Sequence, residues 1–479
     1  MPFTILHISD LHRSPADPIG NQELLSALLA DRDRAQEESP GIAAPDAVVV
    51  TGDLVQGAPL GQPDHEVVLD QQYAVAADFL ELLAETFLDG DRSRLVMVPG
   101  NHDIDWNCAR SAMAPLAETE VPEGFNLRSC HATSNLRWSW RERRVYRIVD
   151  RDLYDQRLAR FDALVDAFYA GSDVAQQHSY RTHRLCDERI AVVAFDSCLG
   201  NDCFAFHGKI DERAIADAFI ELRGSPPDLS IAVWHHSIEG EPIDTAYMSP
   251  STVEDLIGKG FRVGMHGHQH RAAADNRYVH LPDKQEMAIV SAGSLCAAGW
   301  SLPTGVARQY NLIQIDDDLT SARVHVREMV VANNFGPARR TEFGLKGYLD
   351  LDWQLPPFTH RHRAEAGEAR VLEAEKANAA GDFAAAEQFL ADVSTDPGTY
   401  ARNLLRASLE AQEAWARLVA LLDPPATISE LSAATRALTE IGDPDAAEKF
   451  LQEHREEVGM NIPDADNLLA FVAAKRALA

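Results

Sequence analysis

The chain has 479 residues, 44 of them lysine or arginine and 74 aspartate or glutamate, for a formal net charge of −30. Its 46% apolar and 25% charged content excludes a fully disordered chain, and its length indicates two or three domains with a large core. A charge this negative repels phosphates at long range, so it disfavours a constitutive nucleic-acid coat protein without excluding a local metal site that binds phosphate.

The N-terminal residues predict a β-strand and not a targeting segment. MPFTILHISD lacks a basic start and a long apolar stretch, so we expect no signal peptide. No apolar run reaches the ~18–20 residues that a membrane helix needs, so we expect no membrane association. Six cysteines are scattered without a C-x-x-C pair, which favours reduced thiols in a cytoplasmic protein.

Residues 1 to about 330 alternate short apolar runs with amphipathic stretches. The runs are mostly rich in Val and Ile and are followed by Gly, Asp, Asn or His, which predicts strands. These runs are Phe3–Ser9, Ala47–Thr51, Leu95–Val98, Ile190–Phe195, Ile231–Trp234, Phe261–Met265 and Ala288–Ser291. Two later stretches, Tyr310–Ile315 and Ala322–Met329, are typical of antiparallel additions to a sheet.

Helical patterns lie between the predicted strands. They cover Gln22–Arg34, Leu69–Phe87, Tyr154–Tyr169 and Glu212–Leu222. Alternating strands and helices imply βαβ units around a largely buried sheet, and therefore an α/β fold.

Residues 107–150 interrupt the alternation, and we interpret them as an insertion near the functional site. The segment contains two tryptophans and a basic cluster: Trp138, Trp140, Arg141, Arg143, Arg144 and Arg147. It could be a cap that contacts the substrate or a structural excursion with a solvated basic face, and the sequence favours neither.

The remaining sequence divides into an irregular linker, 331–365, and an α-helical region, 366–479. A weak repeat relates Gly381–Leu390 to Gly442–Leu451, each with a Gly-Asp turn followed by small residues that allow close helix contact. The offset between the copies does not match the tetratricopeptide period, so a helical bundle or irregular solenoid is expected. This tetratricopeptide-like region could bind a protein partner, mediate self-association, or simply cover apolar surface.

Five polar clusters carry the chemistry, and most of them stand directly at the C-terminal end of a predicted strand. They are Ser9–His12, Thr51–Asp53, Pro99–Asp103, Trp234–His236 and Met265–His270. Residues beyond the carboxyl ends of strands gather at one edge of an α/β sheet, so these clusters should converge. Each cluster alone has an ordinary structural explanation, whereas their joint occurrence in this context indicates one site.

The side chains in these clusters suit divalent ions. Asp, His and Asn are ligands for Mn, Fe, Zn or Ni, and the absence of Cys disfavours a structural zinc. The spacing of Asp10-x-His12 and His268-x-His270 would place two ligands on one side of an extended segment. Asp53 has two oxygens and can bridge two ions, which at ~3.5–4 Å apart would clamp a phosphate and lower the pKa of a bridging water.

The ordered set of motifs resembles the calcineurin-like metallophosphoesterase superfamily over about residues 1–330. The motifs are Asp10-x-His12, Gly52-Asp53, Gly100-Asn101-His102-Asp103, His235-His236 and Gly267-His268-x-His270. The flanking phrases are most similar to the branch that contains cyclic-nucleotide and glycerophosphodiester phosphodiesterases. This resemblance implies a four-layer α/β/β/α sandwich with two mixed sheets, followed here by an all-α domain.

The resemblance also implies a role for each matching residue. One metal ion would be held by Asp10, His12, Asp53 and His270, and the other by Asp53, Asn101, His235 and His268. Mn²⁺ is the ion expected to support activity. His235 is preferred over His236 because it directly ends its strand.

Two further residues are implied to be catalytic, and a bridging hydroxide would be the nucleophile. His102 would contact a phosphate oxygen and protonate the leaving group as a general acid. Asp103 would orient the ring of His102.

The expected function is therefore that of a dinuclear-metal phosphohydrolase, with a phosphodiester of nucleotide size or another small phosphate ester as substrate. One alternative is a DNA nuclease that resembles the nuclease subunit of double-strand-break repair complexes, although the net charge disfavours a nucleic-acid partner. A third hypothesis is that the chain is a sensor protein that recruits a partner and carries a phosphoesterase domain.

Overall fold

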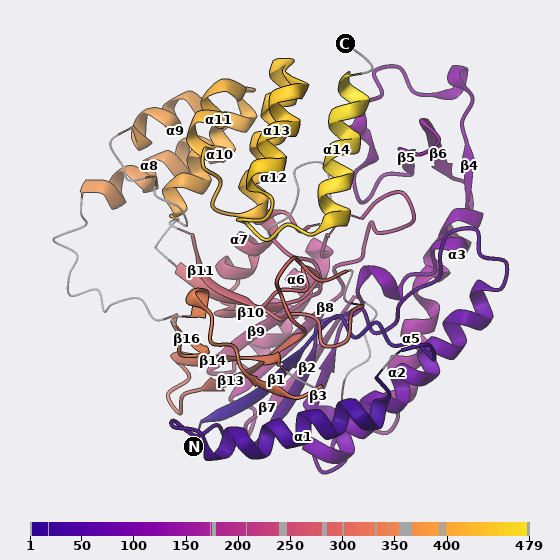
Figure 1. The fold of residues 1–479 in the computed structure, drawn as a ribbon, viewed down its shortest axis with the longest axis vertical. Coiled ribbons are helices and arrows are strands. Elements are labelled where there is room, and N and C mark those ends of the chain that lie inside the picture. Colours follow the sequence, from indigo (N-terminus) through magenta and orange to yellow (C-terminus); the bar gives the residue numbers. More distant parts are fainter. Residues whose placement is uncertain are drawn as a thin grey trace.

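Two β-sheets face each other, helices cover their outer faces, and a separate group of helices follows at the C-terminal end (Figure 1). The computed structural model describes residues 2–17, 19–172, 174, 179–206, 208–238, 247–279, 285–298, 301–330, 333–343, 345–353, 366–391, 395 and 399–476.

The first sheet has seven strands in the order β15-β14-β13-β1-β2-β3, with β16 also paired to β14. Every residue of β1 and β2 is buried, as expected for parallel strands that are covered on both faces. The neighbouring β13 is antiparallel to β1. The strands are β1 (Phe3–Ile8), β2 (Ala47–Val50), β3 (Leu95–Met97), β13 (Gln309–Ile315), β14 (Ser321–Met329), β15 (Phe335–Pro337) and β16 (Tyr348–Asp352).

The second sheet has six strands in the order β11-β12-β10-β9-β8-β7. Its four central strands run parallel, and the edge strands β7 and β11 are antiparallel to their neighbours. The strands are β7 (Tyr180–Leu185), β8 (Ile190–Phe195), β9 (Leu229–Val233), β10 (Val263–His266), β11 (Ala273–Val279) and β12 (Gln285–Ser291).

Apolar side chains form three layers of core. The central layer joins the inner faces of the sheets, for example Ile5 and Val49 from the first and Ile231 from the second. The outer layers lie under α1 (Asn21–Glu37), α2 (His65–Phe87) and α5 (Ala159–Phe168) on one side, and under α6 (Glu212–Gly224) and α7 (Pro250–Gly258) on the other. The predicted α/β/β/α sandwich is confirmed.

Residues 331–365, which were predicted to be an irregular linker, contain two strands. β15 pairs with β14 at Met329↔Phe335, and β16 pairs with β14 at Val324↔Leu349. Both extend the first sheet, so the first domain reaches at least Trp353, which is buried. The sequence did not indicate these two strands, because segments of three and five residues carry no clear periodicity. Residues 354–365 lie outside the described part of the chain.

The insertion folds as a three-stranded sheet with its own small core, beside α3 (Figure 1). Its elements are α3 (Trp106–Ser111), β4 (Met113–Pro115), β5 (Leu136–Ser139), β6 (Arg144–Ile148) and the following α4 (Arg151–Asp155). Arg137 of β5 is fully buried and ion-pairs with Asp202, and the Tyr154 hydroxyl donates to the same carboxylate at 2.7 Å. The insertion is therefore fastened to the first domain by a buried polar cluster.

Each C-terminal helix packs against the next one along the chain. They are α8 (Ala366–Ala379), α9 (Phe383–Leu390), α10 (Tyr400–Ala411), α11 (Trp415–Leu422), α12 (Ile428–Ile441), α13 (Pro444–His454) and α14 (Ile462–Arg476). The two copies of the Gly-Asp motif adopt the same turn, because Asp382 and Asp443 cap α9 and α13 by accepting from Ala385 and Ala446 backbone N–H groups at 3.1 and 3.0 Å. No helix among the described residues is both long and apolar enough to span a bilayer.

A buried ion pair ties α1 to the first sheet. Arg327 of β14 donates to both carboxylate oxygens of Asp31 at 2.8 Å, and both side chains are nearly inaccessible. Tyr310 also donates to Asp31 at 2.5 Å. Burial opposes ionisation of Asp31, but Arg327 outweighs it and lowers the pKa of this carboxyl.

We expect Asp31→Asn to lower the free energy of unfolding by about 1.5–3 kcal/mol, because buried Arg327 loses one of its two carboxylate partners and keeps only Glu38. The pair stabilises the fold above the ordinary pKa of aspartate and loses this effect as the pH falls through the lowered folded-state pKa. Urea unfolding at neutral pH measures the loss. Asp33→Asn, which removes an exposed partner of Arg32, is the matched control and should stay within about 0.5 kcal/mol. Equal effects of the two variants would contradict the prediction.

Candidate metal centre

The C-terminal ends of β1, β2, β3, β9 and β10 bring together the seven side chains that the sequence predicts to be metal ligands. Their backbones are linked across the strand ends: Asp10 N–H donates to the Gly52 carbonyl at 3.1 Å, and Gly267 N–H donates to the His235 carbonyl at 3.1 Å. The seven residues are Asp10, His12, Asp53, Asn101, His235, His268 and His270.

Four of these residues form one group. Asp10, His12, Asp53 and His270 each offer a ligand atom, and these atoms all lie within 4.8 Å of one another. The Nε2 atoms of His12 and His270 are 3.1 Å apart, and Asp10 Oδ1 is 3.3 Å from His270 Nε2. Two imidazole nitrogens facing each other beside two carboxylates are arranged to share a cation.

The other residues form a second group that shares Asp53. Asn101 Oδ1 lies 3.1 Å from His235 Nε2 and 2.9 Å from His268 Nδ1. Asp53 Oδ2 is 3.5 Å from His235 Nε2 in this second group. The same oxygen is 3.8 Å from His12 Nε2 in the first group. The other oxygen, Oδ1, accepts the His102 backbone N–H at 2.8 Å. One carboxylate oxygen thus faces both groups while its partner is held by the backbone.

Backbone carbonyls set the tautomers of two histidines. His270 Nδ1 is 2.8 Å from the Ser301 carbonyl, and His235 Nδ1 is 2.7 Å from the Thr51 carbonyl. A carbonyl can only accept, so each Nδ1 carries a proton and each Nε2 is the ring nitrogen that faces the site. Sequence reasoning missed these supports because a main-chain carbonyl leaves no mark in the residue pattern.

Most of the ligand residues have left-handed backbone conformations. The φ angles are +50° at Asp10, +44° at His12, +52° at Asp53, +77° at His268 and +55° at His270. Non-glycine residues rarely adopt positive φ, and such strain concentrates at functional sites. The expectation that Asp10-x-His12 and His268-x-His270 form extended segments was wrong, because alternate ligands converge here through tight turns.

Glycines allow the loops to approach each other. An added Cβ at Gly100 would lie 2.2 Å from Asp53 Oδ1, and one at Gly52, where φ is +91°, would lie 2.6 Å from His235 Nδ1. Glycine beside the candidate ligands is therefore required by close approach at Gly100, and by both close approach and backbone conformation at Gly52.

We expect Gly100→Ala to abolish stoichiometric Mn²⁺ binding, because the new methyl group must displace the carboxylate shared by both ligand groups. The cost in folding should be only about 1–3 kcal/mol, as is typical of local overpacking. Metal analysis after dialysis, together with urea unfolding, measures both effects. Gly224→Ala is the control, since a Cβ there meets nothing within 4 Å. Full metal occupancy in Gly100→Ala would rule out the geometry described.

The electrostatics of the site favour the deprotonated form of Asp10, His12 and His268, but the protonated form of His270. Burial, together with neighbouring imidazoles, lowers the pKa of His12 and of His268 to about 3. Burial disfavours charge on Asp10 as well, but His270 beside it lowers the pKa of this carboxyl. Conversely, Asp10 outweighs the effect of burial on His270 and raises its pKa to about 9.

Mn²⁺ affinity should therefore rise with pH between about 6 and 8. His270 is protonated there in the metal-free protein and must lose its proton to bind, so one proton per site gives about a tenfold gain per pH unit. Calorimetry in buffers of different ionisation enthalpy would count the released proton. His454→Gln, which alters a histidine of the helical domain, should keep this slope, whereas His270→Gln should flatten it. A flat profile in the unaltered protein would contradict the prediction.

The ring of His102 lies beside the first ligand group. Its centroid is 4.7 Å from that of His12, in an edge-to-face arrangement. Its Nδ1 is 2.8 Å from the Gln56 carbonyl, so Nδ1 carries a proton and Nε2 has no hydrogen-bond partner among the described residues. His102 is thus positioned by Gln56, another main-chain contact that the sequence did not reveal.

Asp103 does not orient that ring. Its carboxylate accepts backbone N–H groups from Gly100 at 2.7 Å, Leu54 at 3.0 Å and Val55 at 3.2 Å. The residue therefore fastens the loop after β2 to the loop after β3. The expected contact with His102 was wrong, because a carboxylate one residue away is drawn to unpaired main-chain donors instead.

His236 is engaged within the protein. Its Nδ1 is 2.9 Å from Ser197 Oγ, and its Nε2 is 2.8 Å from Asn201 Nδ2. With both ring nitrogens used, it has no lone pair to offer beside His235.

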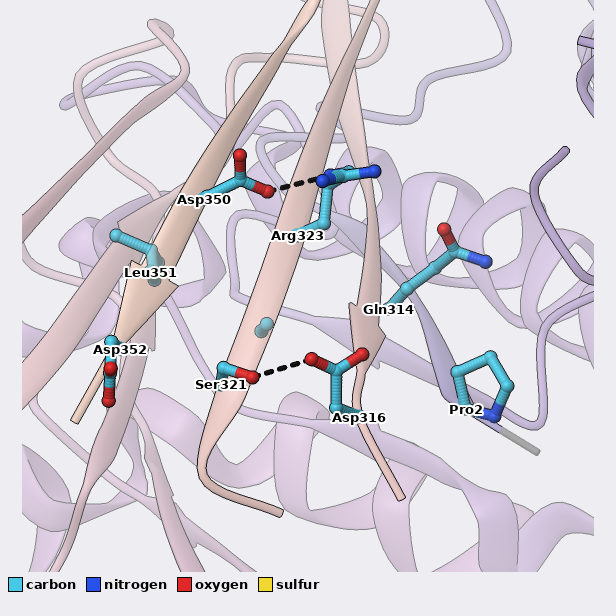
Figure 2. A pocket seen from close by; sticks show the side chains of 9 residues that line it. Pro2, Gln314, Asp316, Ser321, Arg323, Asp350, Leu351 and Asp352 are labelled. Carbon is cyan, nitrogen blue, oxygen red and sulfur yellow. Dashed lines mark hydrogen bonds and ion pairs between the residues drawn. The ribbon is translucent and has the colours of Figure 1, made fainter. Parts of the chain in front are cut away.

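The residues present fit divalent cations. Asp10 Oδ1 is buried and accepts no hydrogen bond of good geometry from the described residues, although His270 Nε2 lies nearby. Carboxylate, amide and imidazole donors in two groups around one shared oxygen match the preferences of Mn, Fe or Zn. Figure 2 shows a different feature, an open hollow of about 420 Å³ lined by Asp316, Arg323 and Asp350. It lies at the opposite end of the first sheet from the strand ends described above, because β13 runs antiparallel to β1.

Fold and site together define a class of protein: an α/β/β/α sandwich with a cluster of candidate metal ligands at the strand ends of its two sheets. A family model for calcineurin-like phosphoesterases matches residues 3–272, which is more than half of the chain. The chain belongs to the calcineurin-like phosphoesterase family.

Comparison with other proteins adds only distant likenesses. No curated protein matches the chain. A structure of PhoD is similar at 11% identity with a TM-score of 0.39, over 73% of this chain and 68% of that one. The structure of the calcineurin-like phosphoesterase YfkN from Bacillus subtilis is similar at 13% identity with a TM-score of 0.31, over 74% of this chain and 90% of that one. The structure of a Vps29 single mutant from Entamoeba histolytica is similar at 12% identity with a TM-score of 0.22, over 74% of this chain and 100% of that one.

Proposed function

We propose that the chain is a phosphodiesterase that requires two divalent metal ions and acts on a nucleotide-type or other small phosphodiester. The observation that carries this proposal is the position of Asp53. Its Oδ2 lies 3.8 Å from His12 Nε2 and 3.5 Å from His235 Nε2, and so faces both ligand groups at once. A single carboxylate oxygen shared in this way is the arrangement that a pair of ions needs.

The ions would supply Lewis acidity, which polarises a phosphoryl oxygen and lowers the pKa of a bound water. Asp10, His12, Asp53 and His270 would hold one ion, and Asp53, Asn101, His235 and His268 the other. The protein contributes a site whose ligands are buried and whose carbonyl contacts already fix two imidazoles, so little reorganisation accompanies binding.

His102 would move a proton. The Gln56 carbonyl holds Nδ1–H, and Nε2 faces away from that contact without a partner among the described residues. A proton on Nε2 would be donated to the departing oxygen of the ester, as a general acid. Asp103 supports this indirectly, by fastening the loop that carries His102 to the loop that carries Asp53.

A nuclease would need basic side chains that lead to the site, and Arg340, Arg143 and Arg144 give this alternative no support. Arg340 ion-pairs with Glu328 at 2.7 Å and donates to the Gly305 carbonyl at 2.8 Å. Arg143 and Arg144 are exposed at the turn between β5 and β6. A partner-binding role for the helical domain stays a prediction; Arg271, next to His270, donates to the Val458 carbonyl at 3.2 Å and thereby joins the two parts of the chain.

Hydrolysis of bis-p-nitrophenyl phosphate and of p-nitrophenyl phosphate, with Mn²⁺ supplied and metal content measured, tests the proposal. We expect about two ions per chain and faster turnover of the diester. Turnover of the monoester alone would replace the diesterase assignment with a phosphatase. No turnover of either, in protein that holds two ions, would favour the sensor alternative.

A further inference from the structure

A row of aromatic rings leads outward from the first ligand group. The ring of His12 contacts that of His102, whose centroid is 6.1 Å from that of Trp106. Trp106 in turn meets Phe206 edge-to-face at 5.7 Å. The last two rings belong to different parts of the chain, the start of α3 and the loop after β8, and both are only partly buried.

The tryptophan is not explained by hydrogen bonding. Its indole N–H is shielded from solvent and has no acceptor among the described residues. A buried unpaired donor is a cost to folding, which a phenylalanine or leucine would avoid. The feature of Trp106 that the structure does use is therefore its large flat surface beside His102.

Trp106 stands on a rigid support. Asp105 caps α3 by accepting the backbone N–H groups of Asn107 and Cys108, both at 3.0 Å. The same carboxylate ion-pairs with Arg160 at 2.9 Å. A ring held by a capped and cross-linked turn loses little freedom when a ligand stacks on it.

Phe206 is anchored through the insertion. Asp202, in the same loop, is fully buried between Arg137 of β5 and the Tyr154 hydroxyl. Two residues before Phe206, the ring of Phe204 stacks at 4.7 Å on Tyr146 of β6. The insertion thus fixes the position of the loop that carries Phe206. The insertion is therefore part of the wall of the site and not a detached cap.

We infer that Trp106 and Phe206 form a specificity-determining wall that binds a planar group of the substrate, such as a nucleobase or an aryl ring. The inference rests on the proposed function, because it places the wall on the side where His102 would protonate the leaving group. Every base or aryl group has a flat face, so the wall selects for planarity and not for one particular base. Esters with small aliphatic groups would gain nothing from it.

Equilibrium binding of two product-like phosphates to the Mn²⁺-loaded full chain tests the inference without requiring turnover. Adenosine 5′-monophosphate carries a planar base, and methyl phosphate carries none. Trp106→Leu should weaken binding of the first by about 5- to 100-fold, the range for losing one stacking contact. Binding of methyl phosphate should change less than about twofold. Trp106→Phe, which keeps a ring, should recover most of the loss.

Trp140→Leu is the matched control, because this exposed tryptophan lies in the turn between β5 and β6 of the insertion and its ring contacts that of Trp138. It should leave both affinities unchanged. Phe206→Leu provides a second variant if Trp106→Leu does not fold, and should weaken adenosine 5′-monophosphate selectively. Equal weakening of both phosphates, or no change for either, would overturn the inference. Failure of the proposed function would instead appear as absent diester turnover in the unaltered chain.

Discussion

Asp53→Asn is expected to lower kcat/KM for a phosphodiester by at least about 10²–10³-fold, the usual cost of one lost electrostatic contact to a transition state. Asp53 accepts on both sides: Oδ1 from the His102 backbone N–H at 2.8 Å, and Oδ2 toward both ligand groups. Asparagine has one acceptor and one donor. If the amide NH₂ faces the ligand groups, it points a donor at the cations. If it faces the backbone N–H of His102 instead, two donors point at each other.

The same variant should retain less than two ions per chain, because each ligand group loses a negative charge. Metal analysis and steady-state kinetics measure the two effects on the same preparation. Asp33→Asn provides an exposed Asp-to-Asn change as control, and thermal unfolding separates loss of metal from loss of fold. An Asp53→Asn protein with two ions and ordinary turnover would show that the shared oxygen is not a bridge.

Residue chemistry predicted the fold where burial follows hydrophobicity, and failed where it does not. Ile190–Phe195 was recognised as a strand because all six of its residues are apolar and buried. Its neighbour β7 was missed, because it contains Arg181 and His183. Both are buried nonetheless, since Arg181 donates to the Met97 carbonyl at 3.2 Å and His183 Nδ1 meets the Ser93 carbonyl at 2.8 Å. A periodicity argument counts such residues as exposed, because their main-chain partners are unknown beforehand.

The candidate site divides in the same way. The types of its ligands and their places after strands could be predicted, because both follow from the sheet architecture. The backbone conformation that orients these ligands could not be predicted. His12 and His268 have φ angles of +44° and +77°, and a histidine in the sequence does not indicate a positive φ. Asp103 illustrates the limit for side-chain roles. The family resemblance implied that Asp103 contacts His102, whereas its carboxylate accepts the backbone N–H groups of Gly100 and Leu54.

His102→Ala should lower kcat by about 10²–10⁴-fold for diesters with an alkoxide leaving group, since this is the usual contribution of a general acid. The fall should be much smaller for bis-p-nitrophenyl phosphate, because a nitrophenolate departs without protonation. His102 belongs to neither ligand group, and its only described side-chain hydrogen bond is to Gln56, so metal content should stay unchanged.

The comparison of the two leaving groups separates proton transfer from positioning. If His102 only oriented the phosphoryl group, its removal would slow both substrates alike. A cyclic nucleotide, whose leaving group is a ribose hydroxyl, and bis-p-nitrophenyl phosphate therefore form the required pair. His131→Ala, which alters a histidine of the insertion that contacts Thr133, controls for a general effect of losing an imidazole. Equal losses for the two substrates, or loss of metal, would remove His102 from the role of acid.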